Sequence, residues 1–523
     1  MNASHSSRPA RVVASGWGWR HASRRLPAVS GLDLVIEPGE RVLLLGPSGA
    51  GKSTLLAGLA GILGDSEDGA EAGALTLDGA PAARQRGRAG LVLQDPEANT
   101  ILPTLGDDVA FGCENLAVPR DEIWRRVARS LDAVGLRYPL DRPTAHLSGG
   151  ERQRLAIAGV LAMSPGLLLL DEPTANLDHA GAAEVRRAVA QTRTTLVVVD
   201  HRVDEWLGLV DRVVVLEPAG GLIADGPPDT VFARAGSALE AAGVWVPGSH
   251  PLVSRTPPGP SPSSLRSSSP DETSDETPDE SSPRGTLGPV CRSSPADPPL
   301  VTAAGVAVGH GGRAVRKDVD LEVRAGESLV ITGPNGVGKT TFAFCLAGLT
   351  SPLEGEVRAS AQLAHGTRSP HPHRWRAQQL LTRIGTVFQR PEHQFVARSV
   401  RDELAVGPRL VGARDQSALV DELLERLRLT HLAHAHPCTL SGGEQRRLSV
   451  ATVLATAPRV LVLDEPTFGQ DRTTWTELAE LVAAHVDSGG AAVSVTHDDD
   501  YVRVLGDRRL RLEATAVAQA VRA

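Results

Sequence analysis

GPSGAGKST at residues 46–54 and GPNGVGKTT at residues 333–341 are the stretches that decide the fold. Each fits the pattern G-x-x-x-x-G-K-[ST], in which glycines let backbone N–H groups curve around phosphate groups. RVLLLG at residues 41–46 reads as a buried strand that runs into the first loop, and residues 52–60 read as the helix that follows it. A strand, a glycine-rich loop and a helix in this order predict a phosphate-binding loop, and the chain carries two.

Different residues of the two loops are predicted to bind the phosphates and Mg²⁺. Lys52 and Lys339 are expected to reach the β- and γ-phosphates, and the hydroxyls of Ser53 and Thr340 are expected to bind Mg²⁺. The complete predicted nucleotide-binding set of the loops is Gly46, Pro47, Ser48, Gly49, Ala50, Gly51, Lys52, Ser53 and Thr54, with Gly333, Pro334, Asn335, Gly336, Val337, Gly338, Lys339, Thr340 and Thr341.

Two further motifs recur in the same order. LSGGERQR at 147–154 returns as LSGGEQRR at 440–447, and LLLLDEPT at 167–174 returns as VLVLDEPT at 460–467. The loop lysines are separated by 287 residues and the members of the other two pairs by 293 residues. Three motifs at nearly one offset indicate an internal duplication.

Strands alternate with helices in each half, which predicts an α/β fold with a mainly parallel sheet. LLLL before Asp171 and TLVVVD at 195–200 are further predicted strands. Helix formers from Asp107 to about Leu140 predict a mainly helical subdomain ahead of the SGGE motif.

The segment from 247 to 299 is rich in Pro, Ser, Thr, Asp and Glu and buries little apolar surface, so it is predicted to be a disordered linker. The predicted domains are therefore 1–246 and 300–523.

Paired carboxylates end a buried strand in each half. Asp171 and Asp464 are placed beside the phosphate-binding loop, where a carboxylate orients Mg²⁺. Glu172 and Glu465 come next and are predicted to polarise the water that attacks the γ-phosphate.

Composition narrows the partners of the chain. A net charge of −8 disfavours nucleic acid, which needs a basic face. The four cysteines have no metal-binding spacing, which favours thiols in a reducing compartment. No stretch reaches the ~18 consecutive apolar residues of a membrane helix, so a transport role would require a second polypeptide as the channel.

LSGGERQR and LSGGEQRR resemble the signature motif of ATP-binding-cassette (ABC) ATPases, and the resemblance covers both halves. It implies P-loop domains with a parallel core, a small antiparallel part and a helical subdomain. It also implies that ATP, with Mg²⁺, binds between the loop of one half and the signature of the other, because a serine, glycine amides and a helix N-terminus form an anion site. Lys52, Ser53, Asp171 and Glu172 would face one signature, and Lys339, Thr340, Asp464 and Glu465 the other. The signature residues are Ser441, Gly442 and Gly443 for the first site and Ser148, Gly149 and Gly150 for the second.

The same resemblance assigns further roles. Gln94 and Gln389 would contact Mg²⁺ near the membrane partner, and His201 and His497 would contact the γ-phosphate. Asp178 and Asp471 match the loop that crosses to the other domain. Trp19, or Trp17, would stack on adenine in the first half, whereas the second half offers His310.

Segments after both glutamines, together with DEPTFGQD at 464–471, are similar to energy-coupling-factor (ECF) and cobalt-type importer ATPases. This implies ATP hydrolysis at the cytoplasmic face of a membrane, with a transmembrane coupling subunit, a small membrane protein that captures a vitamin or metal ion, and head-to-tail pairing of the two domains. The alternatives are a tandem ATPase of a sugar or peptide importer and a soluble tandem ABC protein acting on ribosomes. The acidic, proline-rich linker disfavours the ribosomal alternative, because it opposes both helix formation and RNA contact.

Overall fold

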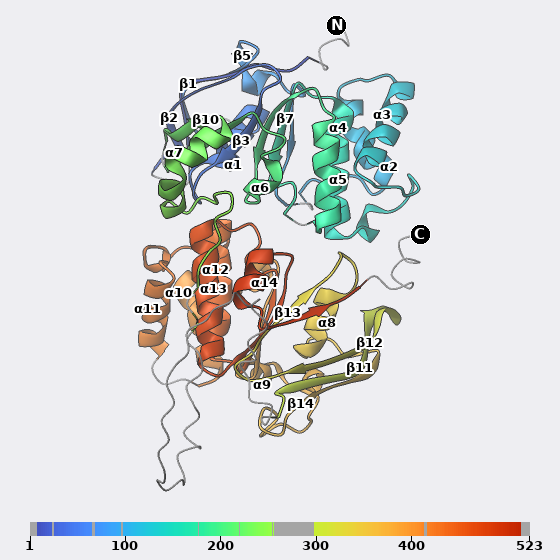
Figure 1. Cartoon of the computed structure of the whole chain (residues 1–523), viewed down its shortest axis with the longest axis vertical. Helices are drawn as coiled ribbons and strands as arrows, with labels where there is room; N and C mark the ends of the chain where they lie inside the picture. The colour runs from blue at the N-terminus through green and yellow to red at the C-terminus, as the bar shows by residue number, and fades with distance from the viewer. Residues whose placement is uncertain are drawn as a thin grey trace, which may run out of the picture.

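A computed structural model describes residues 8–22, 26–64, 68–95, 98–175, 177–218, 220–253, 255, 298–412 and 416–513. The predicted α/β class is confirmed, with two similar halves that each combine a parallel sheet, an antiparallel sheet and helices (Figure 1).

The first half contains two sheets. A four-stranded antiparallel sheet has the order β2-β1-β4-β5, and a six-stranded sheet has the order β10-β9-β3-β8-β7-β6, parallel except for the β10–β9 pair. The strands are β1 Val12–His21, β2 Val29–Ile36, β3 Arg41–Leu45, β4 Gly69–Leu77, β5 Ala80–Pro81, β6 Ala89–Val92, β7 Leu167–Asp171, β8 Thr195–Val199, β9 Arg212–Leu216 and β10 Leu222–Gly226.

The second half repeats this plan with fewer strands. Its antiparallel sheet has the order β12-β11-β14 and its parallel sheet the order β15-β16-β17-β13-β18. The strands are β11 Val301–His310, β12 Arg313–Val323, β13 Ser328–Thr332, β14 Glu354–Ala359, β15 Ile384–Val387, β16 Val460–Asp464, β17 Ala491–Val495 and β18 Arg508–Arg511.

Helices cover the sheets and form the predicted helical subdomain of each half. The first half has α1 Lys52–Ala60, α2 Leu105–Asn115, α3 Arg120–Ala133, α4 Gly149–Met163, α5 His179–Ala190, α6 Val203–Trp206 and α7 Pro228–Ala241. The second half has α8 Lys339–Leu346, α9 Ala377–Leu381, α10 Val400–Leu410, α11 Gln416–Arg426, α12 Gly442–Leu454, α13 Arg472–Asp487 and α14 Asp499–Leu505.

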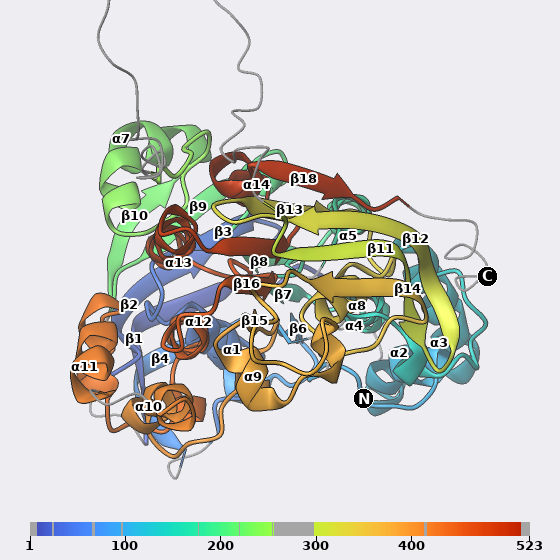
Figure 2. The same ribbon diagram turned by 90° about the horizontal axis from the view of Figure 1, so that it is seen from below.

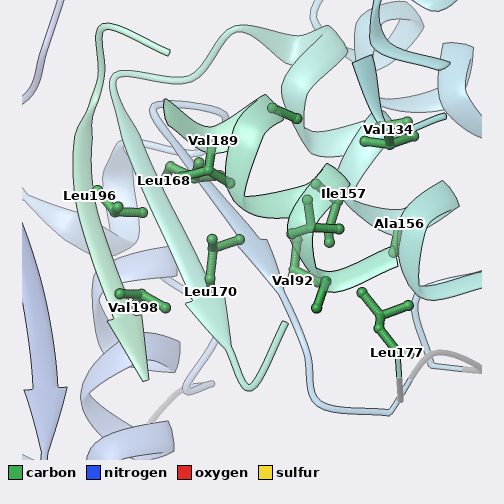
Figure 3. Packing of buried hydrophobic residues seen from close by; sticks show 14 of the residues in the cluster. Val92, Val134, Ala156, Ile157, Leu168, Leu170, Leu177, Val189, Leu196 and Val198 are labelled. Carbon is green, nitrogen blue, oxygen red and sulfur yellow. The ribbon is translucent and has the colours of Figure 1, made fainter. Parts of the chain in front are cut away.

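The central strands are buried and mostly apolar because both faces of the parallel sheet are covered. Leu168 and Leu170 of β7 face one side, where they join Ile157 of α4 and Val189 of α5 in a single cluster (Figure 3). Leu169, between the first two, belongs to the cluster on the opposite face of the sheet. Because β7 is packed on both faces it has little freedom to shift, and the carboxylate of Asp171 at its end is held in place.

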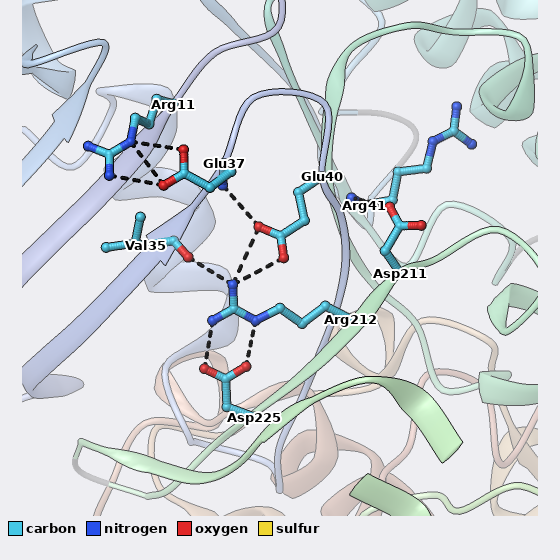
Figure 4. Close-up of polar contacts among 8 residues, drawn as sticks. All are labelled: Arg11, Val35, Glu37, Glu40, Arg41, Asp211, Arg212 and Asp225. Carbon is cyan, nitrogen blue, oxygen red and sulfur yellow. Dashed lines mark hydrogen bonds and ion pairs between the residues drawn. The ribbon is translucent and has the colours of Figure 1, made fainter. Parts of the chain in front are cut away.

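A polar network joins the edge of the first half's core to its antiparallel sheet (Figure 4). The guanidinium of Arg212 on β9 donates to both carboxylate oxygens of Asp225 on β10, at 2.5 and 2.7 Å. The same guanidinium donates to Glu40 and to the Val35 carbonyl oxygen of β2. These bonds fix β10, which leads directly into α7.

Each half presents different elements to the other. Helices α10 and α11 lie near β1 and β2 of the first half, whereas α2 and α3 lie on the side of β12 (Figures 1 and 2). This arrangement places the strand-to-helix loops of each half at the interface between them.

The predicted linker at 247–299 falls mostly outside the described residues, but its beginning does not. Residues 247–253 and Arg255 are described, and Arg255 pairs with Asp507 and Asp487 of the second half. The predicted disorder is therefore wrong for this beginning, which packs against the second half.

Within the described ranges, no helix combines the length and the apolar character needed to cross a membrane.

Candidate functional site

Both glycine-rich loops link a central strand to a helix, as predicted. Gly51 and Gly338 cap α1 and α8 with φ of 85° and 92°, values that favour glycine over residues with a side chain. A Cβ at Gly51 would lie 2.5 Å from the Ala28 carbonyl oxygen. The first loop therefore depends on glycine for both its backbone conformation and its close packing.

The loop lysines curl back over their own loops. Lys52 Nζ donates to the carbonyl oxygens of Gly46 at 2.8 Å and Pro47 at 3.1 Å. Lys339 Nζ makes the corresponding bonds to the second loop at 2.9 and 3.0 Å. Burial lowers the pKa of Lys52, while the nearby Glu172 carboxylate opposes that shift. Each ammonium therefore lies against its own glycine-rich loop, where it can attract a phosphate group.

Asp171 and Asp464 lie at the ends of β7 and β16 beside the hydroxyl of the loop. Thr340 Oγ1 donates to Asp464 Oδ1 at 2.9 Å. Burial raises the pKa of each aspartate to about 6. A buried carboxylate next to a hydroxyl is an oxygen donor set that fits Mg²⁺, which binds few protein groups and completes its shell with phosphate and water oxygens. In the described part of the chain, no cluster of three or more His, Cys, Asp or Glu side chains has a metal-holding arrangement.

The raised pKa of Asp464 predicts how the ligand-free protein responds to pH. A carboxyl whose folded pKa exceeds its unfolded value favours folding most below the unfolded value, near 4, and loses that contribution as the pH rises through about 6. At pH 8, Asp464→Asn is therefore expected to stabilise the ligand-free protein by on the order of 1–3 kcal/mol. Thermal melts from pH 8 to pH 5 should show this gain shrink. The exposed Asp132 serves as the control, because Asp132→Asn should give no such trend; a parent protein at least as stable as Asp464→Asn at pH 8 would contradict the assignment.

Glu172 and Glu465 share an uncommon backbone conformation. Their φ values are 48° and 47°, in the left-handed region that residues with a side chain seldom adopt. Each amide donates to the neighbouring strand, Glu172 to the Val199 carbonyl oxygen and Glu465 to that of Val495. A strained residue held at the same position of both halves indicates a functional constraint on the direction of its carboxylate.

In the first half the predicted polar residues converge on Glu172. Gln94 Nε2 donates to Glu172 Oε2 at 2.8 Å, and His201 Nε2 lies 3.1 Å from Glu172 Oε1. Burial opposes charge on both partners, but their mutual attraction lowers the pKa of Glu172 and raises that of His201. The carboxylate of Glu172 is thus kept ionised.

The second half arranges the same residues differently. His497 Nε2 lies 3.0 Å from Asn335 Oδ1 of the phosphate-binding loop and 3.9 Å from Glu465 Oε1. Burial and the nearby Lys339 ammonium lower the pKa of His497 to about 3, so its imidazole is neutral. Burial and the neighbouring Asp464 carboxylate raise the pKa of Glu465. The glutamate and the histidine therefore form an ion pair in the first half, whereas in the second half the histidine is neutral and the pKa of the glutamate is raised.

Contacts between the halves are reciprocal. The Ser48 amide of the first loop donates to Asp471 Oδ2 of the second half at 3.0 Å. The Asn335 amide of the second loop donates to Asp178 Oδ2 of the first half, also at 3.0 Å. Both aspartates also cap a helix of their own half, α5 and α13. Each loop is therefore tied to a helix N-terminus of the opposite half.

The signature serines begin helices, as expected of an anion site. Ser148 and Ser441 are the N-caps of α4 and α12, each in a capping box. A cavity of about 1590 Å³ lies between the halves. Its lining includes Lys52, Ser53, Thr54, Gln94, Asp171, Glu172 and His201 from the first half and Ser441, Gly442, Gly443 and Gln389 from the second. The residues predicted for the first site are thus brought together around one space.

The predicted stacking role of the tryptophans is wrong. Trp17 and Trp19 belong to the core cluster of the first half and are 0% and 5% exposed, so neither ring is available to a ligand. His21, two residues further along β1, lines the cavity instead, with Nε2 3.4 Å from Thr54 Oγ1. It occupies the same final position of β1 that His310 occupies in β11. Aligning the two repeats strand by strand would have revealed this pair.

Arg446 is a second residue that motif analysis missed. It is 2% exposed and donates to the carbonyl oxygens of Phe388 at 2.7 Å and Gln389 at 2.5 Å. Gln153 takes its place in the first signature helix, fully buried and with neither side-chain polar atom hydrogen-bonded. Among the described residues, the bond from the signature helix to the glutamine loop is therefore present in the second half and has no counterpart from Gln153 in the first.

Two phosphate-binding loops, each followed by a strand-end carboxylate pair and each tied to the other half, define a tandem P-loop ATPase. The profile of the ABC transporter family matches residues 29–175 and 316–468, and the chain belongs to that family. It is a tandem ABC transporter ATP-binding protein, and ATP is its substrate.

Relatives match along nearly the whole chain. YkoD of Bacillus subtilis, whose name describes an HMP/thiamine import ATP-binding protein, is 33% identical over 502 residues, which cover 94% of this chain and 88% of YkoD. SCO2324 of Streptomyces coelicolor, whose name describes an ABC transporter ATP-binding protein, is 33% identical over 517 residues, covering 92% and 88%.

Among solved structures, a chain of the ribosome-bound archaeal Pelota and ABCE1 complex has a TM-score of 0.62 at 21% identity, with 94% of this chain and 76% of that chain covered. At this identity the likeness concerns the fold alone.

Proposed function

We propose that the chain forms two composite ATP sites within itself, each with the phosphate-binding loop of one half and the signature motif of the other. The reciprocal bonds Ser48–Asp471 and Asn335–Asp178 are the observation that carries this proposal. Further support comes from the cavity that Lys52 and Ser441 share. Fusion of the halves raises their effective concentration, which favours pairing within the chain.

In this mechanism ATP bridges a loop and the opposed signature, and so closes the halves. Mg²⁺, held by Ser53, Asp171 and Gln94 or by Thr340, Asp464 and Gln389, would neutralise phosphate charge. Glu172 and Glu465 accept a proton from the attacking water, and His201 and His497 contact the γ-phosphate. Loss of that phosphate removes the bridge, and the halves reopen.

The proposed role of this cycle is to drive an ECF-type importer of a vitamin or metal ion. The protein would lie at the cytoplasmic face of the membrane, bound to a transmembrane coupling subunit and a small substrate-binding membrane protein. Support comes from the similarity to YkoD along both chains and from the ECF-like segments after Gln94 and Gln389. The name of YkoD favours a vitamin over a metal ion.

The alternatives have less support. A sugar or peptide importer would use the same ATP chemistry, and the partner would distinguish it. The likeness to ABCE1, at 21% identity, concerns the fold and does not support a ribosomal role, whereas relatives at 33% identity carry transporter names.

Affinity purification from detergent-solubilised membranes of the native host, followed by mass spectrometry, tests this role. A polytopic coupling protein together with a small membrane protein is the expected result. A periplasmic-type sugar or peptide system, or ribosomes without membrane protein, would contradict the ECF assignment and leave the ATPase assignment standing.

A separate prediction concerns the adenine base. Because His21 faces the cavity beside Thr54, His21→Ala is expected to raise the KM for ATP by about 3- to 10-fold with kcat nearly unchanged, as the loss of a stacking contact would. Steady-state ATPase kinetics measure this, and His21→Phe should restore the KM. A fall in kcat at constant KM would exclude a role in base binding.

A further inference from the structure

The chain that follows α7 forms an interdomain strap, defined as residues 243–253 and Arg255. Figure 1 shows it leaving α7 in green and descending onto the half that contains α13 and α14. At its far end the Arg255 side chain is 5% exposed, and its Nη1 lies 2.8 Å from both carboxylate oxygens of Asp507. At its near end Val244 is buried in the core cluster of the first half. The strap is thus anchored at both ends.

Between these anchors the strap is hydrogen-bonded to the loop that carries Asp471. Trp245 Nε1 donates to the Gln470 carbonyl oxygen at 2.9 Å. The Arg472 amide donates to the Gly243 carbonyl oxygen at 3.0 Å, and Arg472 Nη2 donates to Ser249 Oγ at 3.2 Å. Residues on both sides of Asp471 are therefore bonded to the first half by the strap, independently of the bond from Asp471 to Ser48.

Trp245 also packs against α13, the helix that Asp471 caps. Its ring packs edge-on against Trp475, with centroids 6.0 Å apart. One indole from the first half therefore contacts both the Gln470 carbonyl oxygen, just before Asp471, and the first turn of the helix that Asp471 caps.

The strap is one-sided. In the described part of the second half, the last strand, β18, is not followed by a helix corresponding to α7. Asp178 accepts a hydrogen bond from the Asn335 amide, as Asp471 does from the Ser48 amide. In the described residues, however, no strap of this kind is hydrogen-bonded to the loop that carries Asp178.

We infer that Trp245 is a positioning residue that holds the Gln470–Arg472 loop against Ser48 and so makes the Lys52 site bind ATP more tightly than the Lys339 site. This inference rests on the proposed composite sites. When ATP leaves, the strap keeps the Gln470–Arg472 loop beside the first half, and the described residues provide no such restraint at the Lys339 site. The two ATP sites are then unequal although their motifs are both intact.

ATP binding to the Glu172→Gln/Glu465→Gln protein tests the inference without requiring turnover. Trp245→Ala is introduced into this background together with Lys339→Ala, which leaves only the Lys52 site, or with Lys52→Ala, which leaves only the Lys339 site. Loss of the ring and its hydrogen bond should weaken ATP binding about tenfold at the Lys52 site and less than twofold at the Lys339 site. Trp245→Phe, which keeps the ring contact, should restore part of the affinity. Leu252→Ala is the matched control, because Leu252 is a strap residue that is 90% exposed.

Equal weakening of both sites, or no change at the Lys52 site, would overturn the inference. Circular dichroism and thermal melts of each variant separate loss of folding from loss of positioning, and Trp245→Phe provides a second reading if Trp245→Ala unfolds. If the background protein with Trp245 intact fails to bind two ATP per chain, the composite-site proposal itself fails, which is a distinguishable result.

Discussion

Replacing both Glu172 and Glu465 with glutamine is expected to lower ATP hydrolysis by at least about a hundredfold while ATP binding persists. Glutamine keeps the shape of each side chain but cannot accept a proton from the attacking water. Both residues directly follow a central strand and share a left-handed backbone conformation, so each half places its glutamate in the same way.

The measurement is steady-state phosphate release, paired with filter binding of radiolabelled ATP. Glu322→Gln is a suitable control, since Glu322 is an exposed carboxylate paired with Arg324. Parent-level turnover in the double variant would refute the catalytic assignment. The two single variants compare the two sites, because the surroundings of the glutamates differ. Glu172 contacts both Gln94 and His201, whereas Glu465 lies 3.9 Å from His497.

Combining a substitution in one phosphate-binding loop with a substitution in either signature motif is expected to show which loop and which signature share an ATP site. The number of ATP molecules that remain bound should differ between the two combinations by one per chain. If the sites are composite, Lys52→Ala and Ser441→Arg damage the same site and leave the other intact. Lys52→Ala and Ser148→Arg then damage one site each. In the Glu172→Gln/Glu465→Gln background, the first pair should retain one ATP per chain and the second pair none.

Bound ATP is counted after rapid gel filtration, so cooperativity in turnover does not affect the result. The two pairs are controls for each other because they carry the same kinds of substitution. The reverse outcome, with one ATP retained by Lys52→Ala/Ser148→Arg, would mean that each site lies within one half.

The sequence predicted the fold where the physical signal is local. Apolar runs such as 167–170 end in a carboxylate and follow helix-forming segments, and they form buried strands in the structure. The loops at 46–54 and 333–341 were equally clear, because glycine is required where φ is positive. The duplication then gave the second half from the first.

Positions that depend on packing were not predictable in this way. Trp17 and Trp19 lie two residues apart on β1, so they share a face, but only the three-dimensional packing places that face in the core. His21, at the end of the same strand, lies at the boundary between the core and the cavity. The assignment of the aromatic contact failed because composition and distance along the chain do not specify which end of a strand reaches a ligand.

Composition misjudged the beginning of the linker for a related reason. Proline, serine and acidic residues predict disorder on average, but a few side chains decided the outcome at residues 247–253 and 255. Arg255 pairs with the partly buried carboxylates of Asp487 and Asp507, and Ser249 accepts a hydrogen bond from Arg472, all more than 200 residues away in the sequence. Contacts at such a separation have no local signature.

The number of ATP molecules on a single chain tests the central claim most directly. Native mass spectrometry of the Glu172→Gln/Glu465→Gln protein with Mg·ATP should show one chain of 54.9 kDa carrying two ATP. A species of two chains that forms only with ATP, in place of the doubly loaded single chain, would show that the sites assemble between chains and would contradict the account.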